Sequence, residues 1–339
     1  MRQIVGNKSS LEIINSSIKS GNIPHAYLFE GPEHVGKLTV AKKLAMSLNC
    51  DVKNGACLEC AQCIRINNNT HADVEIIGLD NKESLSSKQD VISIEKVRDI
   101  QKKIALSPFE GKYRVLIFCK AENLTLEASN CLLKTLENPP DGVVIILLSV
   151  NVGTLLSTVV SRCLLIQFKS VSTNLIKNYL VEHYPVSEKQ AVEISRISNG
   201  CPGWAINAVE NNEVIDGLNK VVEKIEMIVK GDLSLRFEYA DDTANIYKKE
   251  KKLVKEELYI WLNYWRDILL TKVGLVELVI HHSKLDFFKL VSDQMSIDKI
   301  FGVIKRLVAT LNLLDSNVNP SLTLEQFMIS LPVINSRIN

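Results

Sequence analysis

Four cysteines closely follow a glycine-rich loop, and this combination constrains the fold more than any other feature of the chain. The loop has the spacing Gly-x4-Gly-Lys, with Gly31, Gly36 and Lys37 at the key positions. A loop of this kind lies between a strand and a helix, because its backbone amides bind phosphate at the helix N-terminus. The cysteines begin one helix's length later, so the sequence predicts a metal-binding insert directly after the first helix of an α/β domain.

Short apolar runs alternate with helical patterns as far as about residue 168. Runs rich in β-branched and aromatic residues predict strands at 26–29, 74–77, 115–119, 143–150 and 163–168. Apolar residues three and four apart predict amphipathic helices between them, as at Ala41, Leu44, Ala45 and Leu48. This alternation implies a parallel sheet with helices on both faces. The polar stretch from Asp80 to Asp90 is predicted to be a surface loop.

The strand signals stop after residue 168. Three short helices are predicted at 172–184, 187–198 and 204–209. Ser187 and Gln190 have the spacing of a capping box, and Gly200 is expected to lie just past the end of that helix. Helical patterns then continue to a last helix at about 322–331, between two prolines. We therefore expect three domains: an α/β domain at 1–168 with its cysteine insert at 50–63, a small helical domain at 169–210 and an all-α domain at 211–339.

Composition limits the possible partners and the cellular compartment. Lys and Arg total 40 against 39 for Asp and Glu, so no strong overall charge draws the chain to nucleic acid or a membrane. No apolar run approaches the ~20 residues of a membrane span. The N-terminal residues lack the apolar stretch of a secretory signal, and the chain has eight cysteines. These features indicate a reducing compartment, the cytoplasm, where clustered thiols bind metal rather than form disulfides.

The cysteine cluster consists of Cys50, Cys57, Cys60 and Cys63. Two overlapping Cys-x2-Cys turns can offer their thiolates to one tetrahedral zinc ion, with Cys50 as the fourth ligand. Four sulfur ligands leave no open position for water, so the expected role of the zinc is structural. Two alternatives remain: unligated thiols, and an iron–sulfur cluster, although no Cys-Pro follows the cluster here.

The phosphate loop departs from the pattern that binds magnesium. A hydroxyl residue normally follows the lysine, but this chain has Leu38, and Thr39 would point about 100° away around the helix. An acid is also expected at the end of the strand at 115–118, where the chain has Cys119 and Lys120. The absence of both expected magnesium ligands argues against ATP hydrolysis. Nucleotide binding through Lys37 and the loop amides is expected to be weak or absent.

Several motifs together resemble the bacterial clamp-loader ATPase family, which has the AAA+ fold. The segments that carry the resemblance are His25–Phe29, Ala128–Pro140 and Ser161–Cys163, together with the four-cysteine insert. Ile4, Val5 and Gly6 look like the segment beside the adenine in that family. The motifs cover about the first 210 residues, and the helical remainder is similar mainly in length and character.

The resemblance also implies which branch of the family this chain joins. Motor subunits, called gamma or tau, are similar but keep an intact phosphate loop, an Asp-Glu pair and an arginine in the small helical domain. This chain has Leu38, Cys119-Lys120 and Trp204 at those places. The resemblance therefore implies a non-hydrolysing stator of the DNA polymerase III clamp loader. Its expected partners are the gamma/tau and delta subunits and, through the assembly, the sliding clamp and primed DNA.

Within this resemblance Arg162 is expected to act as an arginine finger. It would reach the γ-phosphate of ATP held by a neighbouring motor subunit and stabilise charge on the transferring phosphoryl group. For the tripeptide Ser-Arg-Cys alone, an arginine bonded to local carbonyls is the simpler interpretation. Two other functions are possible alternatives: an ATP-hydrolysing gamma/tau-type motor, and a zinc-bearing DNA-binding protein, which the balanced charge disfavours.

Overall fold

The computed structural model describes residues 4–52, 55–78, 91–104, 107–316, 318–332 and 334. The loop predicted at 80–90 lies outside these residues. Two compact units emerge: Met1–His183 with Ser198–Ala205, and Tyr184–Ile197 with Ile206–Asn339. The three-domain division remains a prediction.

A five-stranded parallel sheet forms the centre of the N-terminal unit. Its strands are β1 (Ala26–Glu30), β2 (Val74–Ile77), β3 (Arg114–Phe118), β4 (Val143–Ser149) and β5 (Leu164–Gln167). Their order is β2-β3-β4-β1-β5, and every neighbouring pair is parallel. All residues of β4 are buried, as expected for a strand covered on both faces. The five predicted strands and the predicted α/β fold class are confirmed.

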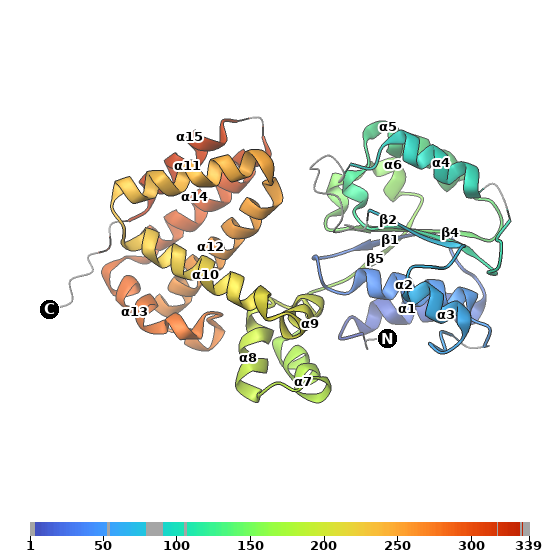
Figure 1. Cartoon of the computed structure of the whole chain (residues 1–339), viewed down its shortest axis with the longest axis horizontal. Coiled ribbons are helices and arrows are strands. Elements are labelled where there is room, and N and C mark those ends of the chain that lie inside the picture. The colour runs from blue at the N-terminus through green and yellow to red at the C-terminus, as the bar shows by residue number, and fades with distance from the viewer. Residues whose placement is uncertain are drawn as a thin grey trace. The chain divides into compact units, whose positions relative to one another are not determined.

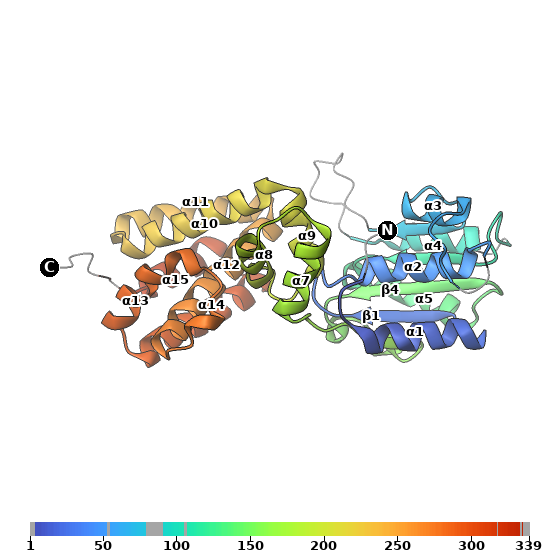
Figure 2. The same cartoon turned by 90° about the horizontal axis from the view of Figure 1, so that it is seen from below.

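Helices cover both faces of this sheet (Figure 1). On one face lie α1 (Lys8–Ser20), α2 (Lys37–Asn49) and α3 (Ala61–Asn67). On the other lie α4 (Ile94–Ile104), α5 (Leu126–Glu137) and α6 (Ser157–Val160). The sheet therefore separates two apolar clusters, one around Phe29 and Leu44, the other around Phe118 and Leu132. Figure 2 shows α1, α2 and α3 along the first face.

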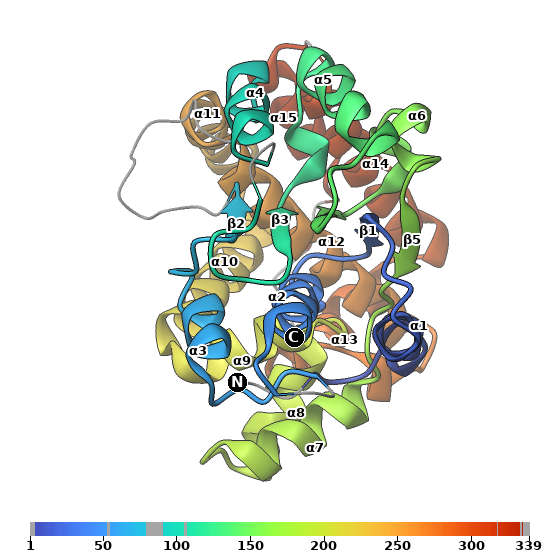
Figure 3. The same ribbon diagram turned by 90° about the vertical axis from the view of Figure 1, so that its right-hand side faces the viewer.

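The loops after β3 and β4 contain short 3-10 turns, η1 (Ala121–Asn123) and η2 (Val152–Thr154). Both turns follow the carboxyl ends of their strands, as does the loop from Gly31 to Gly36 after β1. In a parallel α/β sheet, ligands bind at this edge. The fold thus gathers the segments after β1, β3 and β4 at one edge of the sheet. Figure 3 views the sheet from its end, with α1, α2 and α3 on one side and α4, α5 and α6 on the other.

Three short helices follow the sheet in the sequence: α7 (Thr173–His183), α8 (Glu188–Ile197) and α9 (Pro202–Glu210). The predicted capping box of α8 is present. The Gln190 amide donates to the Ser187 hydroxyl at 3.3 Å, and the Ser187 amide donates to the Gln190 side chain at 3.1 Å. Asn199 and Gly200, both with positive φ, follow the helix as predicted.

The rest of the chain is helical. Its elements are α10 (Asn212–Lys230), α11 (Leu233–Lys249), α12 (Lys251–Lys272), η3 (Val276–Leu278), η4 (His282–Lys284), α13 (Leu285–Gln294), α14 (Ile297–Asp315) and α15 (Pro320–Ser330). Trp261, Trp265 and Phe288 lie in a core that these helices share. None of the helices in the described ranges has the length and apolarity that a membrane crossing requires.

Candidate functional site

The four predicted metal ligands lie together in the N-terminal unit. Cys50 follows the last residue of α2, Cys57 lies in the connecting loop, and Cys60 and Cys63 lie at the start of α3. Their sulfur atoms are all within 4.8 Å of one another. The prediction that this spacing brings four thiols to one point is confirmed.

The sulfur geometry fits a tetrahedral ion. The Sγ atoms of Cys50 and Cys60 are 3.9 Å apart, and those of Cys57 and Cys63 are 4.0 Å apart. Zinc–sulfur bonds of about 2.3 Å in a tetrahedron require sulfur atoms about 3.8 Å apart. The four residues could therefore hold a metal ion such as zinc with only a small adjustment.

Backbone N–H groups already point at several of these sulfurs. The amides of Cys57, Cys60 and Cys63 donate to the sulfurs of Cys50, Cys57 and Cys60 at 3.4, 3.3 and 3.5 Å. Hydrogen bonds from Glu59 and Cys60 lower the pKa of the Cys57 thiol to about 6. Burial instead raises the pKa of Cys63 to about 12. The loop thus favours a thiolate at Cys57, whereas Cys63 needs a cation to become one.

Residues 49–67, which hold the four cysteines and α3, are here called the cysteine module. Side chains of this module and of the segment that precedes β3 bond the two together. The Asn49 side chain accepts from the Tyr113 amide at 2.8 Å and donates to its carbonyl at 3.0 Å. Lys112 donates to the Cys50 carbonyl at 3.1 Å. Arg65 of α3 pairs with Glu110 at 2.6 Å. These bonds connect the metal-binding loop to the edge of the sheet.

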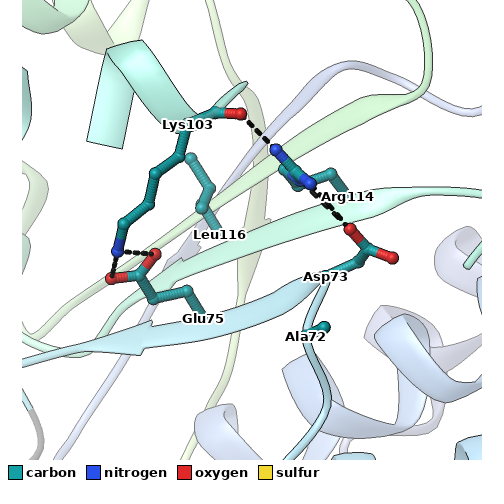
Figure 4. A pocket seen from close by; sticks show the side chains of 6 residues that line it. All are labelled: Ala72, Asp73, Glu75, Lys103, Arg114 and Leu116. Carbon is teal, nitrogen blue, oxygen red and sulfur yellow. Dashed lines mark hydrogen bonds and ion pairs between the residues drawn. The ribbon is translucent and has the colours of Figure 1, made fainter. Parts of the chain in front are cut away.

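A cavity of about 220 Å³ lies beside the same segment, at the start of β2 and β3 (Figure 4). Its charged side chains are paired: Arg114 with Asp73 at 2.8 Å, and Lys103 with Glu75 at 3.0 Å. Asp73 also accepts from the amides of three residues before β3. Because these charged side chains are already paired, the cavity is best explained as part of the packing where β2 and β3 begin, and the ion pairs hold these two strands in place.

The phosphate loop connects β1 to α2, as predicted. Gly31 has φ 148°, and a Cβ there would lie 2.2 Å from the Phe168 carbonyl oxygen, so the loop passes tightly against the end of β5. Gly36, with φ 106°, precedes the first residue of α2. The glycines are therefore required by backbone conformation and close packing.

Lys37 is buried and directed back toward its own loop. Its ammonium group donates to the carbonyls of Gly31 and Pro32, the latter at 2.8 Å. Burial lowers the pKa of Lys37, and the negative charge of Glu122 in η1 is the largest of the opposing effects. One carboxylate oxygen of Glu122 is buried without a hydrogen-bond partner among the described residues. No sequence pattern marks Glu122, because its proximity to Lys37 is a tertiary contact.

The two positions that depart from the magnesium-binding pattern lie as the sequence suggested. Leu38 packs against the apolar cluster around Phe29. Cys119 directly follows β3, whose carboxyl end points to the same edge as the phosphate loop. A leucine side chain and a thiol replace the hydroxyl and carboxylate oxygens that magnesium prefers.

The start of α9 lies against the phosphate loop. The Gly203 amide donates to the His34 carbonyl at 2.8 Å, and a Cβ on Gly203 would lie 2.7 Å from that oxygen. Trp204, which stands where the family resemblance predicts an arginine, is the next residue along α9. The first turn of this helix therefore belongs to the surroundings of the loop.

Arg162 lies between α6 and β5, with its side chain about one-third exposed. Its guanidinium donates to the Thr158 carbonyl at 2.8 Å and pairs with Glu137 at 2.7 Å. Glu137 is the last residue of α5. Within this single chain Arg162 is therefore bonded to a local carbonyl, the simpler interpretation of Ser-Arg-Cys, and it also pairs with Glu137, a partner that no sequence pattern marks.

Comparison with known proteins identifies the family. A family model described as DNA polymerase III, delta subunit, matches residues 6–172. The delta' subunit of DNA polymerase III from Bacillus subtilis is 27% identical over 327 residues, which cover 95% of this chain and 94% of that protein. The chain belongs to the DNA polymerase III clamp-loader family.

A gamma subunit is almost as similar in sequence as the delta' subunit. The gamma subunit of DNA polymerase III from Buchnera aphidicola is 26% identical and covers 90% of this chain and 84% of its own length. A gamma subunit-related structure from Thermotoga maritima covers 94% of this chain and 97% of its own, at 15% identity and a TM-score of 0.39. The nearly equal sequence identities to the delta' and gamma subunits identify the clamp-loader family but not the branch to which this chain belongs.

Proposed function

We propose that this chain is a delta-prime-type stator of the DNA polymerase III clamp loader. In this role it hydrolyses no ATP itself, helps the assembly load the sliding clamp onto primed DNA, and works in the cytoplasm. Its proposed partners are the gamma/tau and delta subunits. It would then be a non-catalytic member of a DNA-synthesising holoenzyme.

The observation that carries this proposal is the pair of substitutions around the phosphate loop. A partly buried leucine, Leu38, packs against the core cluster where a magnesium-binding hydroxyl would be needed, and Cys119 follows β3 where an acid would be needed. Magnesium and its ligands neutralise the charge that develops during phosphoryl transfer. A site without them binds nucleotide weakly at most, through Gly31, Gly36 and Lys37.

Arg162 is proposed to act on a neighbouring subunit. It lies at the start of an edge strand and is about one-third exposed, so its guanidinium can exchange partners. The pair with Glu137 would hold it in place before assembly, and the γ-phosphate of the neighbour's ATP would compete for it. Such exposed ion pairs contribute only about 0–1 kcal/mol, so the exchange costs little.

The remaining parts receive structural roles in this proposal. Zinc bound by Cys50, Cys57, Cys60 and Cys63 would fix the loop between α2 and α3. The helical domain at 211–339 would form the oligomerising collar. The alternative, a gamma/tau-type motor, is supported by the retained Gly31, Gly36 and Lys37 and by the similarity to gamma subunits.

The decisive experiment measures ATP hydrolysis stimulated by clamp and primed DNA, in a loader reconstituted from this chain with its gamma/tau and delta subunits. We expect no hydrolysis by the chain alone. Arg162→Ala should assemble normally but reduce hydrolysis at the adjacent motor site by roughly 10³-fold or more. Arg162→Lys should not restore the rate, since lysine lacks the planar fork of donors.

Arg98→Ala, at an exposed arginine on α4, is the matched control and should leave hydrolysis unchanged. Hydrolysis by the isolated wild-type chain, abolished by Lys37→Ala, would establish the motor alternative. Full loading activity by Arg162→Ala would show that this arginine is only structural.

A further inference from the structure

The phosphate loop is closed by its own lysine. In a working loop of this kind the lysine contacts the phosphates of the nucleotide. Here the buried ammonium group of Lys37 donates instead to the carbonyl oxygens of Gly31 and Pro32. A phosphate group that enters the loop must therefore draw Lys37 away from both carbonyls.

Glu122 lies on a firmly held turn at the same edge of the sheet. It belongs to η1, which follows β3. The Ile92 amide donates to the Asn123 carbonyl at 2.9 Å, and the Thr125 amide donates to the Ile92 carbonyl at 3.1 Å. On the other side of Glu122, Ala121 is fully buried. Any movement of Glu122 would therefore disturb contacts on both sides of it.

One oxygen of the Glu122 carboxylate is buried without a donor. No described group donates a hydrogen bond to its Oε2 atom. Burial of a charged oxygen in this way costs free energy, because the oxygen loses water and gains no hydrogen bond. Attraction to Lys37 offsets part of this cost. A destabilising acidic group at a ligand-binding edge indicates a functional requirement.

The groups that act electrostatically on Lys37 are acidic. Burial lowers the pKa of Lys37, and the charges of Glu122, Glu33 and Cys201 oppose this effect in that order. Glu33 is exposed, so water screens its charge. The buried oxygen of Glu122 is screened least, because charges interact more strongly where water is absent.

Two other lysines lie near this edge, and both have partners of their own. Lys42, on α2, donates to the Asn67 carbonyl at 3.2 Å and interacts electrostatically with Cys119. Lys120, which directly precedes η1, also has an interaction partner. Lys37 is therefore the cation on which a phosphate in the loop would depend, and Glu122 already acts on it.

We propose that Glu122 excludes nucleoside di- and triphosphates from the phosphate loop. A polyphosphate there would bring several negative charges beside a buried carboxylate, and such like charges repel strongly. Magnesium would offset the repulsion in a working site, but Leu38 and Cys119 stand where two of its ligands are expected. The inference rests on the proposed function in taking this loop as an unused nucleotide site, and it names a residue that keeps nucleotide out.

The test measures binding of a fluorescent ATP analogue to the full-length chain by anisotropy, in magnesium-free buffer. Glu122→Gln keeps the size of the side chain and removes its charge, so it should raise the affinity about tenfold. Inorganic triphosphate should compete with the analogue for this variant. Adenosine should bind the variant and the wild type equally, because it carries no phosphate. Adding Lys37→Ala to Glu122→Gln should remove the gain.

Two other acids provide controls. Glu127→Gln removes an exposed charge from the first turn of α5 and should leave the affinity unchanged. Glu33→Gln removes an exposed charge from the loop itself and should raise the affinity less than about threefold, because water screens this charge. Circular dichroism verifies the folding of every variant. Glu122→Ala, a second neutral variant, should show the same gain as Glu122→Gln.

The outcomes separate this inference from the proposed function. Folded Glu122→Gln and Glu122→Ala chains that bind the analogue like the wild type would overturn the inference. An equal gain in Glu127→Gln, or an equal gain for adenosine, would overturn it as well. These results would leave the stator proposal intact as long as the isolated chain hydrolyses no ATP. Hydrolysis by the wild type that Glu122→Gln abolishes would refute both, because Glu122 would then belong to an active ATPase site.

Discussion

The buried carboxylate of Asp73 accepts hydrogen bonds from three backbone amides and pairs with Arg114. Burial raises its pKa, but the amides of Glu110, Phe109 and Gly111 and the Arg114 side chain lower it by more, so the net pKa lies well below its usual range. A carboxyl group with a lowered pKa stabilises the fold above its unfolded pKa of about 4. That contribution is lost as the pH falls below this value.

Replacing Asp73 by asparagine should therefore destabilise the N-terminal unit by about 3 kcal/mol, because it leaves Arg114 without its charged partner. Urea unfolding at neutral pH measures the loss. The difference from the wild type should shrink progressively as the pH falls below about 4, because the carboxyl of the unfolded chain is protonated there while the folded one stays ionised. Asp99→Asn, at an exposed pair with Lys102, should change stability by less than about 1 kcal/mol. A loss at Asp73 that is independent of pH would contradict this explanation.

Cys57 and Cys63 give the metal site a defined pH dependence. Cys57, with a pKa of about 6, is largely ionised at neutral pH, whereas Cys63, with a pKa of about 12, must release a proton to the solvent when metal binds. Zinc affinity should therefore rise at least about tenfold for each pH unit across the neutral range. Competition with a chromogenic chelator measures it. Cys63→Ser should weaken zinc binding strongly. Cys131→Ser, which lies outside the cluster, is the control and should not weaken it. A zinc affinity that does not change with pH would exclude proton release from Cys63.

At the scale of elements, the first turn of α2 holds one residue that matches the phosphate-loop pattern and one that departs from it. Lys37 begins the helix and Leu38 follows it, with one side chain near the loop and the other in the core. Replacing Leu38 by threonine alone should not create hydrolysis, because the acid after β3 is still missing. The same is expected of Cys119→Asp alone.

The double variant Leu38→Thr/Cys119→Asp tests whether these two positions are sufficient. We expect magnesium-dependent nucleotide binding, measured with a fluorescent ATP analogue, to increase at least about tenfold over the wild type, because both oxygen ligands are restored. Adding Lys37→Ala should abolish the gain. Strong magnesium-dependent binding by the wild type would show that the site never lost its function.

The last helix illustrates how local signals misplace a boundary. We predicted that α15 begins at about residue 322, after Pro320, but it begins at Pro320 itself. Proline suits the first turn of a helix, and Asn319 caps it by accepting from the Ser321 amide at 3.0 Å. Pro320 is therefore the first residue of this helix and does not lie before it.

At the scale of the whole molecule, the two units should respond separately to local changes. Arg236 is buried in the helical unit and donates to the carbonyls of Ile228, Val229, Leu331 and Pro332. It thereby connects the end of α10 to the chain after α15. Its removal would leave buried carbonyls without donors.

Arg236→Leu should lower the free energy of unfolding of the helical unit by about 3–5 kcal/mol. If the four cysteines hold zinc, as proposed, its removal by a chelator should instead destabilise only the α/β unit. Hydrogen exchange followed by mass spectrometry can assign each loss to its own unit. Arg306→Leu, at an exposed arginine of α14, is the control and should cost less than about 1 kcal/mol. Loss of protection throughout the chain in either experiment would show that the units unfold together.

The sequence by itself determined the features that depend on local spacing. Strand composition, helical periodicity, the Ser187–Gln190 capping box and the four-cysteine spacing are short-range patterns, and each formed as predicted. The family also followed from short motifs, because these are read along the chain.

Only the tertiary structure decided which distant residues meet. It brings Glu122 near Lys37, pairs Arg162 with Glu137, and joins Phe109 to the cysteine module through Glu110 and Arg65. No regular spacing along the sequence predicts these contacts, because each one forms only when the sheet and its loops fold. Residue spacing therefore predicts the elements and the metal ligands, whereas the charges and surfaces around them follow from packing alone.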